Sequence, residues 1–212
     1  RFQSMLKSGF WGLFFVMIML GIFLNRRAAL IAALGIPISF LGAFILMKFN
    51  GITINMLSMF GLIMVLGIVV DDAIIVVENV QRYITQGMAP REAAIKGTKE
   101  VALPVFATVL TNIAAFIPLL FATGLIGEFL SIIPKVAIFA LLVSLLEALI
   151  IMPSHCAEWM KPQKKRVVTK ATWFLKIRAY YLKGLIFSLR NRYVVVVTFI
   201  FMLFLSFFII KG

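Results

Sequence analysis

Two adjacent carboxylates, Asp71 and Asp72, interrupt an otherwise apolar stretch at residues 61–77. A charged side chain at the centre of a membrane costs about 3 kcal/mol or more. Neighbouring positions on a helix are about 100° apart, so the two side chains can flank one space between helices without pointing the same way. Two nearby carboxylates at low dielectric do not both ionise easily. The pair is therefore suited to binding and releasing protons.

A third acid, Glu147, lies inside another apolar stretch, and the six apolar cores contain no Lys or Arg. Counted from the outer end of each stretch, Glu147 and Asp71 are at nearly the same depth. The acids are either protonated or paired with a cation from another part of the protein, and we favour the second. A structural acid bonded to Thr, Ser or Asn is the alternative, and for Glu147 it stays open.

The elements that carry these acids are apolar runs. Of the 212 residues 63% are hydrophobic and 14% are charged, far from the averages of soluble domains. Runs of about 20 apolar residues cross a bilayer, and lipid forces each of them to be a helix. We expect an all-α, polytopic membrane bundle of six transmembrane helices at residues 9–25, 28–48, 55–82, 101–122, 132–153 and 193–211.

The charge is strongly basic, with 21 Lys and Arg against 8 Asp and Glu. Sixteen of the cations fall on one side of the six predicted spans and five on the other. Positive charge collects on the cytoplasmic side of membrane proteins, so we expect both termini to lie outside the cytoplasm. The excess charge therefore indicates membrane topology rather than nucleic-acid binding.

Residues 168–190 differ from the spans. Apolar side chains recur there at helical spacing, with cations largely elsewhere: Phe174, Ile177, Tyr181, Leu185 and Leu189. This pattern predicts a cytoplasmic amphipathic helix at the membrane surface, its cations facing anionic head groups. Nucleic-acid binding is the weaker alternative, since an aromatic-rich helix between two spans is typically interfacial.

Two sets of residues indicate how the spans meet. The second span carries a stripe of small residues, which lets helices approach closely in lipid: Ala28, Ala32, Gly35, Ser39 and Gly42 or Ala43. The fourth span holds Thr108, Thr111 and Asn112, whose polar groups can bond to a neighbouring helix. We take Thr111, Asn112, Glu147 and Asn79 as possible accessory groups beside the acidic pair.

The remaining reactive side chains are few. The lone Cys156 excludes an internal disulfide and a Cys-based metal site. His155 and Cys156 have no evident partners in the sequence, so we assign neither a role. We expect no metal and no cofactor, and protons as the coupling ion.

The ends of the chain suggest a piece of a larger protein. It begins at Arg1 without an initiator Met or a signal sequence, and both ends stop where a helix leaves the membrane on the outer side. The alternative is a mature chain processed at Arg1.

Three stretches are similar to a known family. Residues 67–80, GIVVDDAIIVVENV, resemble the fourth transmembrane helix of the resistance-nodulation-division (RND) superfamily, closest to the hydrophobe/amphiphile efflux pumps of the acriflavine-resistance type in Gram-negative inner membranes. The likeness continues through residues 87–94 and 153–162 and covers nearly the whole chain, as helices two to seven of twelve.

The resemblance implies a homotrimeric, proton-driven exporter, a secondary transporter and not an enzyme. It implies two six-helix halves with periplasmic domains, a periplasmic adaptor and an outer-membrane channel. It assigns proton binding to Asp71 and Asp72, with a Lys partner from the second half. The chain then looks like the first membrane half without its first helix, the porter domains or the second half, and we expect it to be inactive alone.

Two alternatives stay open beside this hypothesis. One is an RND-related lipid exporter or protein-translocation accessory, although such relatives usually vary the acidic pair. The other is a membrane module that does not transport. Glu147, within residues 144–148, departs from the best-known drug pumps and looks like a feature of a subgroup.

Overall fold

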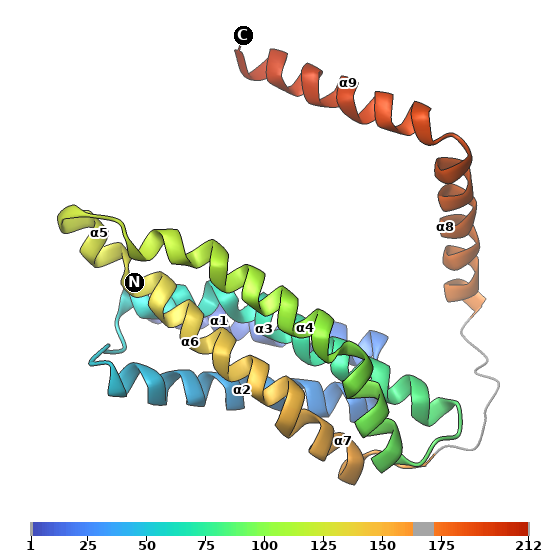
Figure 1. The fold of residues 1–212 in the computed structure, drawn as a ribbon, viewed down its shortest axis with the longest axis horizontal. Coiled ribbons are helices and arrows are strands. Elements are labelled where there is room, and N and C mark those ends of the chain that lie inside the picture. The colour runs from blue at the N-terminus through green and yellow to red at the C-terminus, as the bar shows by residue number, and fades with distance from the viewer. Residues whose placement is uncertain (1, 163–171, 212) are drawn as a thin grey trace. The chain divides into compact units, whose positions relative to one another are not determined.

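The computed structural model describes residues 2–162 and 172–211, which are helical apart from short turns. The chain divides into two units at residue 166. The first contains α1 (Phe2–Phe23), α2 (Arg26–Phe49), α3 (Met56–Thr85), α4 (Pro90–Leu120), α5 (Gly124–Leu130), α6 (Ile132–Leu146), the π-helical turn η1 (Glu147–Ile151) and α7 (Met152–Trp159). The second contains α8 (Thr172–Arg190) and α9 (Arg192–Lys211) (Figure 1).

Five helical segments among the described residues are long and apolar enough to cross a membrane. They are Arg26–Phe49, Met56–Thr85, Pro90–Leu120, Ile132–Trp159 and Arg192–Ile209. The first predicted span corresponds to a shorter apolar stretch, Lys7–Ile22, within α1. The prediction of an all-α membrane helix bundle is confirmed.

Several boundaries differ from the sequence-based ranges. The fourth span belongs to one 31-residue helix, α4, because the helix that starts at Pro90 continues into the apolar run without a break. The short helix α5 and the π turn η1 were not predicted. The predicted surface helix overlaps α8, and its first residues, 168–171, lie outside the described part of the chain.

The ends of α3 follow from local chemistry. The Asn55 side chain accepts hydrogen bonds from the backbone N–H groups of Leu57 and Ser58, while the Ser58 hydroxyl accepts one from the Asn55 N–H, which forms a capping box. Beyond the other end Gly87 adopts a φ of +96°, which suits glycine. Pro90 then starts α4, where its missing N–H costs nothing.

Helix α3 is the centre of the first unit and packs against α2, α4 and α6. A Cβ atom at Gly61 would lie 3.0 Å from the carbonyl oxygen of Ile133, and the Ser144 hydroxyl donates to the carbonyl of Val69 at 3.5 Å. Both contacts advance along the two chains in the same direction, so α3 and α6 are parallel. The small residues of α2 lie on its buried face, as predicted: Ala28, Ala32, Ser39 and Ala43 are all buried.

The core of this unit consists of two apolar clusters. One includes Val76, Val80 and Met152, and the other includes Val65, Val136 and Leu141. Between them four buried polar residues lie on three elements and the π turn: Ser39, Asp72, Ser144 and Glu147. We call these four residues the polar layer.

The π turn lies where α6 would otherwise run directly into α7. The N–H of Met152 donates to the carbonyl of Glu147, five residues earlier, which is the hydrogen bond of a π turn. Pro153 follows and has no N–H to donate, so the α-helical hydrogen-bond pattern is already interrupted here.

The second unit contains α8 and the apolar helix α9. On α8 the side chains of Ile177, Tyr181, Leu185 and Leu189 are exposed, and so are nearly all the described side chains of α9. Within this unit, α8 and α9 therefore do not cover one another's apolar faces.

We predict that Gly97→Ala destabilises the protein because a Cβ atom there would lie 2.9 Å from the Cα of Val80, and backbone cannot move aside cheaply. Gly67→Ala is the matched control on α3, since its Cβ would meet nothing within 4 Å and Ala favours a helix by about 1 kcal/mol. Thermal unfolding in detergent measures both. Equal stability of the two variants would contradict the close approach of α3 and α4.

Candidate functional site

The acidic pair lines a hollow of about 530 Å³ between α3 and α4. From α3 it receives Ile68, Asp71, Asp72 and Ile75, and from α4 it receives Ala107, Thr108, Thr111 and Asn112. Both sets follow the spacing of three and four residues that places side chains on one face of a helix. The hollow is thus built by one face of each of two neighbouring helices.

The two aspartates have different surroundings within the hollow. Asp72 is only 3% exposed, and its Oδ2 atom has no hydrogen-bond partner, whereas Asp71 is exposed. Among the described residues the only ion pair joins Arg82 to Glu100, so neither aspartate is neutralised by a cation there. The hollow therefore combines one buried and one accessible carboxyl group.

The wall formed by α4 is polar but uncharged. The hydroxyl of Thr108 donates to the carbonyl of Val105, and the hydroxyl of Thr111 donates to that of Ala107, both at 2.8 Å. Their protons are thereby committed to the backbone, and the oxygen lone pairs remain free to accept. Asn112 adds an amide that both donates and accepts. This wall can accept a hydrogen bond from a protonated carboxyl group.

Of the predicted accessory residues, Thr111 and Asn112 lie in the hollow with the pair. Thr108 joins them, and its spacing of three and four residues from the other two was the signal in the sequence. Asn79 and Glu147 do not line the hollow, and each lies in a different environment.

Asn79 lies seven residues beyond Asp72, about 10 Å further along α3. Its Nδ2 donates to the carbonyl of Gly97 at 2.7 Å and to Oε2 of Glu100 at 3.0 Å. The same Glu100 oxygen accepts from Arg82 at 2.7 Å and from Tyr83 at 2.8 Å. Asn79 thus belongs to a polar cluster that joins the end of α3 to the start of α4.

Glu147 begins the π turn and faces α2 instead of α4. A Cβ atom added at Gly35 would lie 2.8 Å from both of its carboxyl oxygens. The Ser144 hydroxyl donates to the Val69 carbonyl, and α3 and α6 are parallel. Asp72 lies three residues after Val69 and Glu147 three residues after Ser144, so the two acids lie at similar depth. The two acids belong to one layer but open toward different helices.

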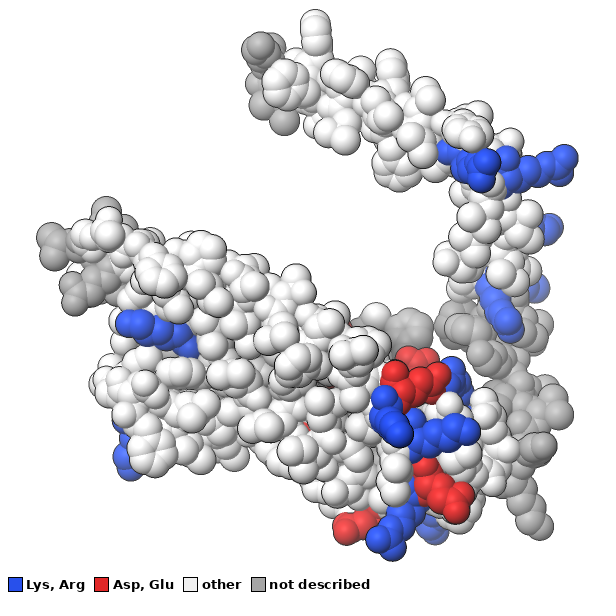
Figure 2. Space-filling model, in the orientation of Figure 1, with Lys and Arg blue, Asp and Glu red and all other residues white. Residues whose placement is uncertain are grey.

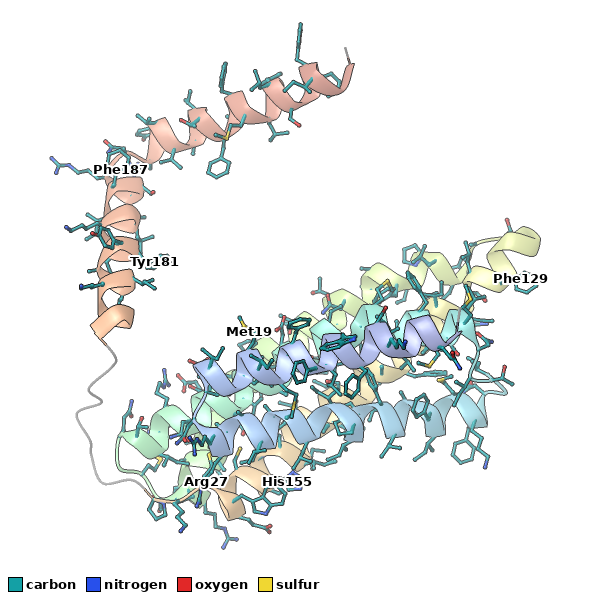
Figure 3. The ribbon with its side chains drawn as sticks, turned by 180° about the vertical axis from the view of Figure 1, so that it is seen from behind. Met19, Arg27, Phe129, His155, Tyr181 and Phe187 are labelled. Carbon is teal, nitrogen blue, oxygen red and sulfur yellow. The ribbon has the colours of Figure 1, made fainter. Side chains whose placement is uncertain are left out.

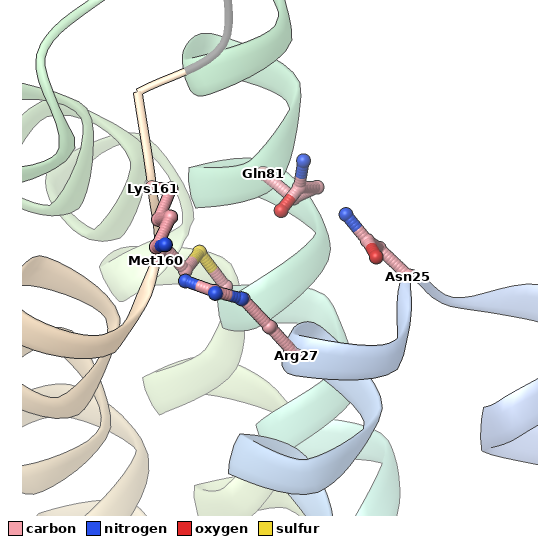
Figure 4. Close-up of a pocket in the computed structure, with 5 residues that line it drawn as sticks. All are labelled: Asn25, Arg27, Gln81, Met160 and Lys161. Carbon is pink, nitrogen blue, oxygen red and sulfur yellow. The ribbon is translucent and has the colours of Figure 1, made fainter.

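A second polar hollow of about 280 Å³ lies at one end of the bundle and was not predicted (Figure 4). Asn25, Arg27, Gln81, Met160 and Lys161 line it, and it has no acid. The Arg27 guanidinium donates to the carbonyl of Trp159 at 2.9 Å and so ties the start of α2 to the end of α7.

The ends of the bundle carry most of its charge. On the face that Figure 2 shows, Lys, Arg, Asp and Glu side chains gather at one end of the first unit, a few Lys or Arg side chains lie at the other end, and the surface between is nearly uncharged. Figure 3 places Arg27 and His155 at one end and Phe129 of α5 at the other. The hollow with Asp71 and Asp72 lies away from these ends, since both aspartates are near the middle of α3.

His155 and Cys156 occupy α7. The His155 ring stacks on Trp159 with ring centroids 4.9 Å apart, and the Cys156 thiol is free and buried. In residues 2–162 and 172–211 no three His, Cys, Asp or Glu side chains come together in a way that could hold a metal ion.

Comparisons with known proteins agree with the geometry. The model of the AcrB/AcrD/AcrF family matches residues 3–211. Multidrug resistance protein MdtC of Pantoea ananatis is 40% identical over 152 residues, which cover 71% of this chain and 15% of that protein. MdtC of Photorhabdus laumondii is 35% identical over 171 residues, 79% of this chain and 16% of that protein. The chain thus spans about 15% of the length of these relatives. The resemblance noted in the sequence is confirmed, and the chain belongs to the AcrB/AcrD/AcrF family of RND efflux transporters.

Proposed function

We propose that this chain is the membrane half of a proton-driven multidrug efflux transporter, in which Asp71 and Asp72 bind the coupled proton. The observation that carries the proposal is the hollow between α3 and α4, where one buried and one accessible carboxyl group meet without a cation among the described residues. The names of the relatives, multidrug resistance proteins, support drugs or amphiphiles as cargo.

The chemistry of the hollow suits a reversible proton site. A proton can bind first to Asp71, which is accessible. The neighbouring residue is Asp72, whose Oδ2 atom has no hydrogen-bond partner. The protonated carboxyl group gains an O–H that Thr108 or Thr111 can accept, because their own protons are bound to the backbone. The ionised pair has no O–H to donate to these oxygens and is instead stabilised by a nearby cation. Loading and release therefore favour different surroundings.

We infer that the cation comes from another part of the transporter, a lysine of the second membrane half. Helix α4 leaves Leu103, Phe106 and Leu110 exposed, which offers a neighbouring helix an apolar surface beside the hollow. A lysine that enters would pair with the ionised aspartates and leave when they are protonated. The packing of the helices around the hollow would then change each time the aspartates bind or release a proton.

The proposed setting is the inner membrane of a Gram-negative bacterium, with both ends of this chain on the periplasmic side. The complete transporter is a homotrimer that works with a periplasmic adaptor and an outer-membrane channel. More of the described Lys and Arg side chains of the first unit lie at the end with Arg27, Arg82 and Lys96 than at the end with Lys48 and Lys135. This excess supports the proposed orientation, because such charge is typical of a cytoplasmic face.

We predict that Asp71→Asn and Asp72→Asn each abolish efflux by the full-length transporter, because an amide cannot carry the coupled proton. Drug accumulation in cells, with expression checked in membranes, measures this. Glu158→Gln is the matched control, an exposed acid on α7 outside the hollow. Efflux retained by either aspartate variant at normal expression would overturn the proposal.

Thr111→Val removes the oxygen that accepts from a protonated carboxyl group but preserves the shape of the side chain. We expect a several-fold loss of efflux, since one hydrogen bond contributes about 1 kcal/mol. Thr198→Val is the control, because Thr198 makes the same bond to a carbonyl four residues back, on α9. If both variants lose activity equally, Thr111 acts through the helix and not through the hollow.

The 212-residue chain alone is expected not to couple transport to protons, since the described residues place no cation at Asp71 and Asp72. We would reconstitute it in liposomes with a pH-sensitive dye inside and add candidate drugs. The expected trace matches empty liposomes. Drug-dependent proton flux that disappears in Asp72→Asn would show that the chain is sufficient.

A further inference from the structure

Glu147 is a buried carboxyl group that the hollow between α3 and α4 does not use. Its side chain is 1% exposed, and its Oε1 atom has no hydrogen-bond partner. It stands at the first position of the π turn, an arrangement that is frequent at functional sites. A buried polar atom without a partner calls for an explanation, and a functional role is one.

The backbone of α2 comes directly up to this carboxyl group. A Cβ atom at Gly35 would lie 2.8 Å from Oε1 and 2.8 Å from Oε2, closer than real Cβ atoms come. Only glycine therefore allows the present position of Glu147. The contact closes the carboxyl group off from the α2 side.

A second unpartnered group belongs to the same face of α2. Ser39 lies one helical turn after Gly35, is fully buried, and its hydroxyl oxygen has no hydrogen-bond partner. Facing helices thus bring an unpaired hydroxyl and an unpaired carboxyl oxygen into the polar layer. A protonated carboxyl group has an O–H that a serine oxygen can accept, whereas an ionised one can only accept.

The charges around Glu147 favour its neutral form. The elements that pack most closely against η1 are α2, α3, α6 and α7. Their described titratable groups are Arg26, Arg27 and Lys48 on α2, Asp71, Asp72, Glu78, Arg82 and Tyr83 on α3, Lys135 on α6, and His155, Cys156 and Glu158 on α7. None of the cations among them pairs with Glu147. An ionised Glu147 would be a buried charge without a compensating cation among the described residues.

We propose that Glu147, with Ser39 and the space left by Gly35, forms a second proton-binding site in the membrane, separate from Asp71 and Asp72. On loading, a hydronium ion gives its proton to a carboxylate oxygen of Glu147, one O–H bond forms, and a water molecule leaves. Release reverses this step when α2 moves away and water enters. The site does not depend on the acidic pair being the coupled relay.

The test is infrared difference spectroscopy of the protein in lipid bilayers, titrated with acid and base. The expected result is a protonated-carboxyl C=O band that Glu147→Gln removes and the double variant Asp71→Asn/Asp72→Asn keeps. Ser39→Ala should shift that band, because the protonated carboxyl group loses the oxygen proposed to accept its O–H. If Glu147→Gln does not fold, the band shift in Ser39→Ala still tests the proposal. A spectrum without any Glu147-dependent band, or a band that responds to Na⁺ at constant pH, overturns the proposal.

Glycine variants separate a proton site from ordinary packing. Gly35→Ala should displace the carboxyl group and abolish or shift its band. Gly42→Ala is the matched control on the same helix, because its Cβ would strike Val143, an apolar side chain of α6. It should lower thermal stability without altering the band. An unaltered band in Gly35→Ala, or the same change in both variants, would reduce Gly35 and Glu147 to packing partners.

Discussion

Carboxyl groups in the middle of an apolar bundle impose a condition that the rest of this structure meets. Each buried polar group must find a partner, a proton or a route to water, since hydrocarbon offers none. The polar layer divides the core into two apolar clusters, which hold α2, α3, α4 and α6 on either side of it. Asp72 and Glu147 are thereby fixed in position by apolar packing rather than by polar bonds of their own.

The polar layer is open on the side of α4 and closed on the side of α2. Toward α4 the acids open into a hollow with hydroxyl and amide groups, and Asp71 is accessible from it. Toward α2 the carboxyl group of Glu147 is closed in by backbone at Gly35. An open site suits exchange with a partner that comes and goes, whereas a closed site suits a proton held until the helices separate. A single parallel pair, α3 and α6, supports both.

Much of this could be predicted from residues alone. Lipid leaves helices as the only structure for long apolar runs, and Asp71, Asp72, Thr111 and Asn112 are brought together by helical spacing. The positions of Asn79 and Glu147 were not accessible in this way, because which helix a face meets depends on packing between distant segments. The π turn was also not predicted, although buried residues on this segment recur at intervals of four: Ala140, Ser144, Ala148, Met152, Cys156 and Met160. In an α-helix such a series drifts about 40° per turn, and a π turn offsets part of the drift.

The contact between Gly35 and Glu147 also links two positions that are far apart in the chain. A methyl group at residue 35 and a carboxyl group at residue 147 cannot occupy the same space. A larger residue at position 35 therefore requires the Glu147 carboxyl group, the far end of a flexible side chain, to move from its present position. The close approach of α2 thus couples residues 35 and 147, because the side chain at one position determines where the side chain at the other can lie.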